Sequence, residues 1–94
     1  MDFESDDEKN AENIRKHRID FADAIRIFDG PVHETVDDRY DYGELRLVST
    51  GLLYGVTCIV VTHTDRNGKT RIISARKADK DERTIHDGAI FGQT

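Results

Sequence analysis

The chain has 94 residues, enough for one domain with a single hydrophobic core. Its formal net charge of −5 argues against unspecific binding of nucleic acid through many phosphate contacts. One cysteine, Cys58, excludes an internal disulfide and a four-thiolate metal site, and no apolar stretch reaches the roughly 20 residues that cross a bilayer. With no signal peptide, we expect a single cytoplasmic domain over 1–94, with 88–94 as a flexible tail, and no membrane contact.

The N-terminal third predicts a short strand and two helices. Phe3 opens the strand, and Ser5 with Glu8 three residues on forms a capping box for a helix ending near His17. Asp20 caps a second helix. Its buried stripe has the i, i+3, i+4, i+7 spacing of an amphipathic helix and consists of Phe21, Ala24, Ile25 and Phe28.

The rest of the chain has the pattern of a sheet. An edge strand at 32–36 and a polar loop at 37–43 precede a strand at 45–50, a turn at 51–55 and a β-branched central strand at 56–63. An Asn67-Gly68 hairpin turn leads to a last strand at 70–76, and a final helix starts at Asp79 and frays near Gly88. The order β-α-α-β-β-β-α predicts an α+β fold, a small antiparallel sheet with helices packed on one face.

Positive charge collects around the last strand. Residues 66–83 hold seven Lys or Arg against three Asp or Glu, a net of +4 within an acidic protein. The planar fork of an arginine gives paired hydrogen bonds to two phosphate oxygens. This concentration of cations at one end of the sheet therefore predicts a site for one or two phosphates.

A set of short motifs, in order over residues 3–86, resembles the BrnT family of bacterial type II toxins. The motifs are Phe3-Glu4-Ser5-Asp6 with Lys9, Asn13 with Lys16-His17, Phe21-Ala22-Asp23-Ala24, Phe28-Asp29-Gly30-Pro31, Asp41-Tyr42-Gly43-Glu44-Leu45-Arg46 with Gly51, Thr62-His63-Thr64-Asp65-Arg66, and Arg71-Ile72-Ile73-Ser74-Ala75-Arg76-Lys77-Ala78 with Glu82-Arg83. The chain departs from the family at Ser5, Arg18 and His86, where Trp, Gly and Tyr are usual.

The resemblance implies a RelE-like fold and an endoribonuclease that needs no metal or cofactor, cleaves RNA and stops translation. It also implies neutralisation by a BrnA-type antitoxin with a ribbon-helix-helix domain. We expect a 2:2 heterotetramer, which would reach operator DNA only through the antitoxin. Two other readings stay open: a non-catalytic binding module, or an inactive toxin homologue, whose basic sheet edge docks an acidic partner.

A metal-independent ribonuclease needs a base near the ribose 2′-OH, cations around the phosphate and an acid for the leaving 5′-oxygen. Arg76 ends the last strand and is the first candidate, and Arg66 lies at the tip of the hairpin beside that strand. The candidate catalytic residues are Arg76, Arg66, Glu44 and His17. The candidate substrate-binding residues are Arg46, Lys16, Arg71 and Lys77. The histidines show no metal-ligand spacing, so no metal is predicted.

Each candidate also has a structural interpretation. Arg76 could instead form an ion pair with Glu82, and Glu44 could be a solvated partner of Arg46. Arg71 and Arg76 are five positions apart, so strand alternation puts them on opposite faces unless a bulge intervenes.

Overall fold

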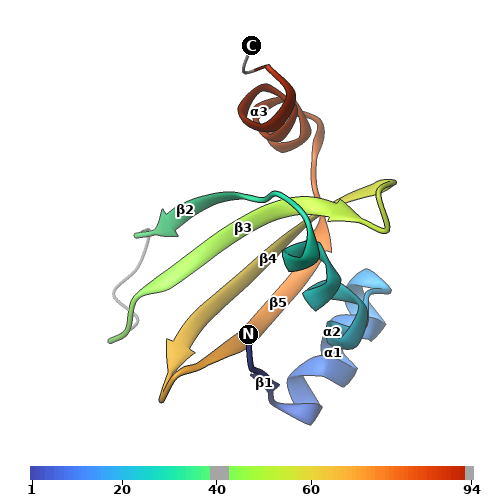
Figure 1. Ribbon diagram of the computed structural model, residues 1–94. Helices are drawn as coiled ribbons and strands as arrows, with labels where there is room; N and C mark the ends of the chain where they lie inside the picture. The colour runs from blue at the N-terminus through green and yellow to red at the C-terminus, as the bar shows by residue number, and fades with distance from the viewer. Residues whose placement is uncertain (39–42, 93–94) are drawn as a thin grey trace.

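The computed structural model describes residues 1–38 and 43–92, which form a five-stranded sheet, three α-helices and one 3₁₀ helix (Figure 1). In chain order the elements are β1 (Phe3–Ser5), α1 (Asp7–His17), α2 (Phe21–Ala24), η1 (Ile25–Asp29), β2 (His33–Asp37), β3 (Arg46–Leu53), β4 (Thr57–Arg66), β5 (Lys69–Lys77) and α3 (Lys80–Phe91). The predicted α+β class is confirmed. The predicted order β-α-α-β-β-β-α has one strand too few, because the segment expected as an edge strand at 32–36 forms β2 and joins the sheet. The predicted loop at 37–43 falls partly on residues 39–42, outside the described residues.

The sheet is mixed rather than wholly antiparallel. Its strand order is β1-β5-β4-β3-β2, and the pairs from β2 to β5 are antiparallel. β1 instead runs parallel to β5 over three residue pairs, from Phe3↔Thr70 to Ser5↔Ile72. All the elements from α1 to β4 lie between β1 and β5 in the chain. Sequence patterns within single segments do not reveal a pairing between strands that are so far apart.

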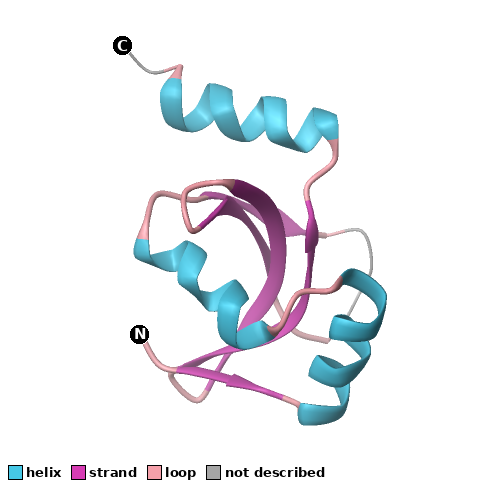
Figure 2. Cartoon of the chain, turned by 90° about the vertical axis from the view of Figure 1, so that its right-hand side faces the viewer, coloured by secondary structure: helices cyan, strands magenta, loops and turns pink. Residues whose placement is uncertain are grey.

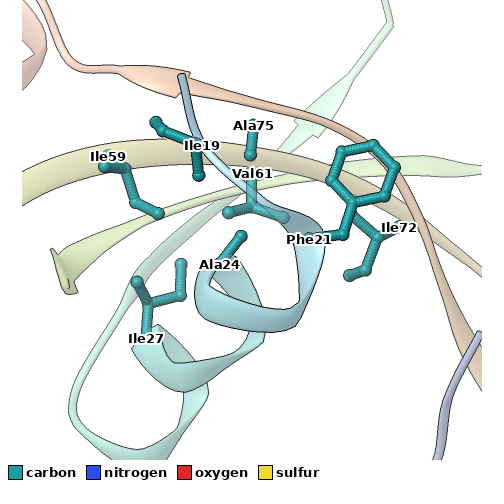
Figure 3. Close-up of a cluster of buried hydrophobic side chains, with 8 residues drawn as sticks. All are labelled: Ile19, Phe21, Ala24, Ile27, Ile59, Val61, Ile72 and Ala75. Carbon is teal, nitrogen blue, oxygen red and sulfur yellow. The ribbon is translucent and has the colours of Figure 1, made fainter. Parts of the chain in front are cut away.

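The core lies between the sheet and the segment that holds Ile19, α2 and η1 (Figure 3). β4 is the central strand, and its inward residues Ile59 and Val61 are fully buried. They meet Phe21 and Ala24 of α2 and Ile27 of η1. The β-branched residues of β4 fit this position because they pack well on a pleated surface.

The prediction that all helices pack on one face is wrong for α3. Phe21 and Ala24 belong to one cluster with Ile72 and Ala75 of β5, which places α2 on that face. Arg76, the next residue of β5, points the other way and binds Glu82 of α3. Figures 1 and 2 show α3 well separated from α1 and α2, beyond the opposite side of the sheet.

The first two helices differ from the prediction, one in its cap and the other in its type. Asp6, rather than Ser5, is the N-cap of α1, since its carboxylate accepts the backbone N–H groups of Glu8 and Lys9 at 2.9 and 3.1 Å. Ser5 is the last residue of β1. The second helix begins at the predicted cap, Asp20, but continues as a 3₁₀ helix after one α-helical turn.

Two further segments extend beyond their predicted ends. β3 continues through Gly51 to Leu53, so the turn to β4 is shorter than predicted. A Cβ on Gly51 would lie 3.0 Å from Val32 and 3.1 Å from Ile27, so this glycine allows close packing rather than a turn. α3 runs past Gly88 to Phe91, so residues 88–91 are helix rather than tail.

Candidate phosphate-binding face

A β-bulge in β5 decides which cations share a face of the sheet. Thr62 pairs with Ser74 and His63 pairs with Ile72, so Ile73 is an extra residue on β5. Arg71 consequently lies on the same face as Arg76, opposite to α1 and α2. From the sequence alone, these two arginines were predicted to lie on opposite faces unless a bulge intervened.

Four arginines occupy this face, and we call it the arginine face: Arg46, Arg66, Arg71 and Arg76. Arg71 pairs with Thr64 of β4, and alternation from Thr64 adds Arg66. Leu47 pairs with the inward residue His63, so its neighbour Arg46 points outward.

Two of these arginines, Arg46 and Arg66, meet Glu44 at the hairpin end of the sheet. Both Nε and Nη2 of Arg66 donate to Oε2 of Glu44, at 3.3 and 3.2 Å. Nε of Arg46 lies 3.5 Å from the other oxygen of Glu44. The hydrogen bond from Arg66 is the largest cause that lowers the pKa of Glu44. Glu44 is therefore ionised at neutral pH and is a weak proton acceptor.

Arg76 stands at the other end of the face in a two-pronged ion pair. Its Nη1 and Nη2 donate to Oε1 and Oε2 of Glu82, each at 2.7 Å. Glu82 also accepts the backbone N–H of Asp79 at 2.9 Å, closing the capping box of α3. The Arg76 hydrogen bonds are the main cause that lowers the pKa of Glu82 to about 2. The predicted structural pair thus exists, and it fixes the guanidinium of Arg76 to α3.

The two ends of the arginine face are far apart. Arg76 pairs with Val60 on β4, whereas Arg66 lies six residues further along that strand. At a rise of about 3.3 Å per residue, this separates them by roughly 20 Å. A single phosphate cannot bind both residues, although an extended nucleic acid strand could reach from one to the other.

A groove of about 330 Å³ lies on this face beside Arg76. Its floor comes from Val48, Val60, Thr62 and Ser74 of β3, β4 and β5. Carboxylates line its rim, namely Asp37, Asp38 and Glu82. The groove has room for a group the size of a nucleotide, with Arg76 as its cation.

The predicted site residues of α1 lie at the edge of the sheet, away from Arg76. Lys16 and His17 line a recess of about 230 Å³ together with Lys9, Glu12, Asn13, Ile73 and Ser74. Nζ of Lys16 is 2.8 Å from a carboxylate oxygen of Glu12. Ser74 lines both this recess and the groove on the arginine face.

The candidate Lys77 and two histidines, His63 and His86, take positions that weaken a direct role. Lys77 pairs with the inward residue Ile59, so it points away from the arginine face. His63 is 3% exposed, bonded to the Ser49 hydroxyl through Nε2 at 2.8 Å, and burial lowers its pKa. His86 is 1% exposed and packs edge-on against Phe91, so its ring offers no open surface to a base.

Sequence reasoning gave no role to Asn13, which completes the edge of β5. Its amide oxygen accepts the N–H of Ala75 at 3.0 Å, and its amide nitrogen donates to the carbonyl oxygens of Ala75 and Ile19, both at 2.9 Å. The side chain therefore replaces a neighbouring strand at one position. A polar residue on the thin apolar face of α1 was the available signal.

The described residues, 1–38 and 43–92, contain no group of three or more His, Cys, Asp or Glu that could hold a metal ion. Within the same ranges, no helix is long and apolar enough to span a membrane. Cys58 is buried on the central strand, and burial raises the pKa of its thiol.

Residues 6–82 match the family described as the ribonuclease toxin, BrnT, of type II toxin–antitoxin systems. The match covers most of the chain, and the protein belongs to this family of ribonuclease toxins. Among solved structures it is similar to the Brucella abortus ribonuclease toxin, BrnT, with 28% sequence identity and a TM-score of 0.66. That comparison covers 85% of this chain and 99% of the Brucella chain. A search of curated proteins found no match.

Proposed function

We propose that this protein is the toxin of a type II pair and cleaves RNA by attack of a ribose 2′-OH on the adjacent phosphate, without a metal ion. The observation that carries the proposal is the presence of four arginines on one face, to which the β5 bulge brings Arg71. Fixed cations around a phosphate stabilise the negative charge that develops as the 2′-oxygen attacks. The RNA substrate places the proposed activity in the cytoplasm.

Arg76 is the residue that we propose for the scissile phosphate. Its guanidinium borders the groove and presents a planar fork, the geometry that suits two phosphate oxygens. Glu82 holds this fork in the apo protein and must share it with, or release it to, the substrate. The Glu82 carboxylate thus positions Arg76 and also limits its free charge.

We assign secondary roles to the remaining candidates by their positions. Arg66, Arg46 and Arg71 would bind phosphates along the strand, toward the hairpin. Glu44, held ionised by Arg66, would orient Arg46 and Arg66 and is a poor general base at neutral pH. His17 would be the better proton acceptor or donor, because an imidazole can exchange a proton near neutral pH.

The family implies an antitoxin partner, and we propose a BrnA-type antitoxin in a 2:2 complex that reaches operator DNA through the antitoxin. An acidic antitoxin segment could bind the arginine face and mask the phosphate site. Such an interface would weaken as salt rises, because exposed charges are screened.

The experiment compares induced expression of the wild type, Arg76→Ala and Arg26→Ala in bacteria. Arg26 is a matched control, because it is an arginine in an ion pair with Asp29 and lies on η1, away from the arginine face. We expect growth arrest from the wild type and Arg26→Ala, and none from Arg76→Ala. Purified wild type should cut RNA in the presence of a metal chelator, and all three proteins should show the same circular dichroism and bind the antitoxin.

A non-catalytic binding module is the second candidate function, favoured by the full engagement of Arg76 with Glu82. It predicts no arrest and no RNA cleavage by any folded variant, together with weaker partner binding by Arg76→Ala. That result would refute the ribonuclease proposal. Cleavage that disappears with the chelator and returns with a divalent cation would refute metal independence alone.

A further inference from the structure

The edge of β5 that faces α1 is covered at two places and open between them. β1 pairs with β5 as far as Ile72. Asn13 of α1 satisfies the backbone of Ala75. Between these two points lie the bulged residue Ile73 and Ser74, both half-buried.

The groove and the α1 recess meet at this opening. Ser74 is on the arginine face, because it pairs with Thr62, and it lines the groove that holds Arg76. Ser74 also lines the recess of Lys9, Lys16 and His17. Ser74 therefore borders two hollows, one on the face and one beside the edge.

The recess has the charge of an anion subsite. It is lined by two lysines and a histidine against a single carboxylate, Glu12. Lys16 holds Glu12 at 2.8 Å, and this hydrogen bond is the main cause that lowers the pKa of Glu12. Both side chains are about half exposed, at 52% and 54%, and an ion pair of this kind is weak. A phosphate can therefore take the place of Glu12 beside Lys16.

We propose that the RNA strand crosses the edge of the sheet at Ser74, so that one phosphate binds Arg76 in the groove and a neighbouring phosphate binds Lys9 and Lys16 in the recess. This inference rests on the proposed ribonuclease function and adds a second phosphate subsite to it. The bulge lies at the crossing point, because the inserted residue Ile73 is next to Ser74 and also lines the recess.

The path also defines the class of substrate. A strand that turns over the edge of a sheet within one or two nucleotides must bend sharply and unstack. Duplexes resist such bending, whereas unpaired nucleotides in loops and ends are readily splayed out. The substrate is therefore RNA that is single-stranded at the cleavage position.

The test uses 2′-O-methyl RNA oligonucleotides, which lack the attacking hydroxyl and stay intact during binding. Each oligonucleotide carries one uncharged methylphosphonate, moved stepwise along the strand, and its affinity is measured by fluorescence anisotropy. The proteins are the wild type, Arg76→Gln, the double variant Lys9→Gln/Lys16→Gln, and Arg26→Gln as the control. The control fits because the pair of Arg26 with Asp29 is about as exposed as that of Lys16 with Glu12.

We expect the lysine variant to bind the unmodified strand roughly tenfold more weakly at low salt, with the slope of log K against log salt falling by about 0.7 per lost phosphate contact. One methylphosphonate position should weaken the wild type but leave the lysine variant unaffected. A second methylphosphonate position, one or two nucleotides from the first, should weaken the wild type but leave Arg76→Gln unaffected. Arg26→Gln should match the wild type, and duplex RNA should bind far more weakly than the single strand.

Three outcomes would overturn the inference. If every methylphosphonate position weakens the lysine variant as much as it weakens the wild type, the recess binds no particular phosphate. A crossing at Ser74 would be excluded if the positions that no longer affect the two variants lie many nucleotides apart. It would also be excluded if duplex RNA binds as tightly as the single strand. Each of these outcomes leaves the ribonuclease proposal standing if Arg76→Gln still loses affinity, whereas wild type that neither binds nor cleaves RNA refutes both proposals.

Discussion

Removing the charge of Glu82 should make the stability of this protein less dependent on acid pH. The substitution Glu82→Gln keeps the size of the side chain and an oxygen that can accept the Asp79 N–H, so the capping box of α3 can persist. It removes the ionic bond to Arg76. The change therefore isolates the charge on which the position of Arg76 depends.

The magnitude follows from the pKa of Glu82, which falls from 4.5 to about 2 in the folded protein. At about 1.36 kcal/mol per pKa unit, a fully buried pair would contribute about 3 kcal/mol. The side chains of Arg76 and Glu82 are 44% and 27% exposed, and solvent screens the pair. We therefore expect Glu82→Gln to lower the free energy of unfolding at pH 7 by about 1 to 2 kcal/mol.

The sign of the pH dependence is fixed by the direction of the shift. A carboxylate whose pKa is depressed by folding stabilises the protein above its unfolded pKa and loses that contribution as pH falls toward the folded pKa. For Glu82 this window runs from 4.5 down to about 2. The difference between wild type and variant should be constant above pH 5 and, at pH 3, less than roughly half as large.

Urea unfolding followed by circular dichroism, at several pH values between 7 and 3, gives this difference directly. Other acidic groups titrate in the same range, but they are common to both proteins and cancel in the comparison. A difference that is the same at pH 7 and pH 3, or that is below about 0.3 kcal/mol throughout, would refute the reasoning that the ion pair stabilises the fold.

Two further predictions concern residues that hold α1 in place. Asn13→Ala removes three buried hydrogen bonds and leaves the N–H of Ala75 without its partner, so we expect a loss of about 2 to 3 kcal/mol in urea unfolding. A loss below about 1 kcal/mol would mean that water replaces the amide. Asp6→Ala should cost about 1 kcal/mol, as for other N-cap residues, whereas Ser5→Ala should cost under about 0.5 kcal/mol. Thermal unfolding that ranks these two variants in the reverse order would restore Ser5 as the cap.

The local sequence predicted many features of the fold, because turns, strands and helix caps depend on the backbone preferences of neighbouring residues. Asn67-Gly68 predicted the hairpin turn, and both residues have positive φ, 52° and 79°. The β-branched run that begins at 56 predicted a central strand, and β4 is central. The Asp20 cap was also correct, since its carboxylate reaches a backbone N–H two residues away.

The sequence predicted the candidate site only in part, because its residues interact with residues that are far away in the chain. The sequence identified the arginines and named Glu82 as a possible partner of Arg76. It did not show that Arg66 and Arg76 lie at opposite ends of the sheet, because that separation depends on the antiparallel register of β4 and β5.

By itself, the sequence determined the elements, the family and the types of residue that can bind a phosphate, because these follow from local patterns and ordered motifs. Only the tertiary structure decided which of those residues act together. One inserted residue, Ile73, turns Arg71 to the face of Arg76, and the pairing of β1 with β5 leaves the edge open at Ser74. A bulge has no fixed sequence signature, and strand pairing is set by contacts between segments more than 60 residues apart, so neither could be read along the chain.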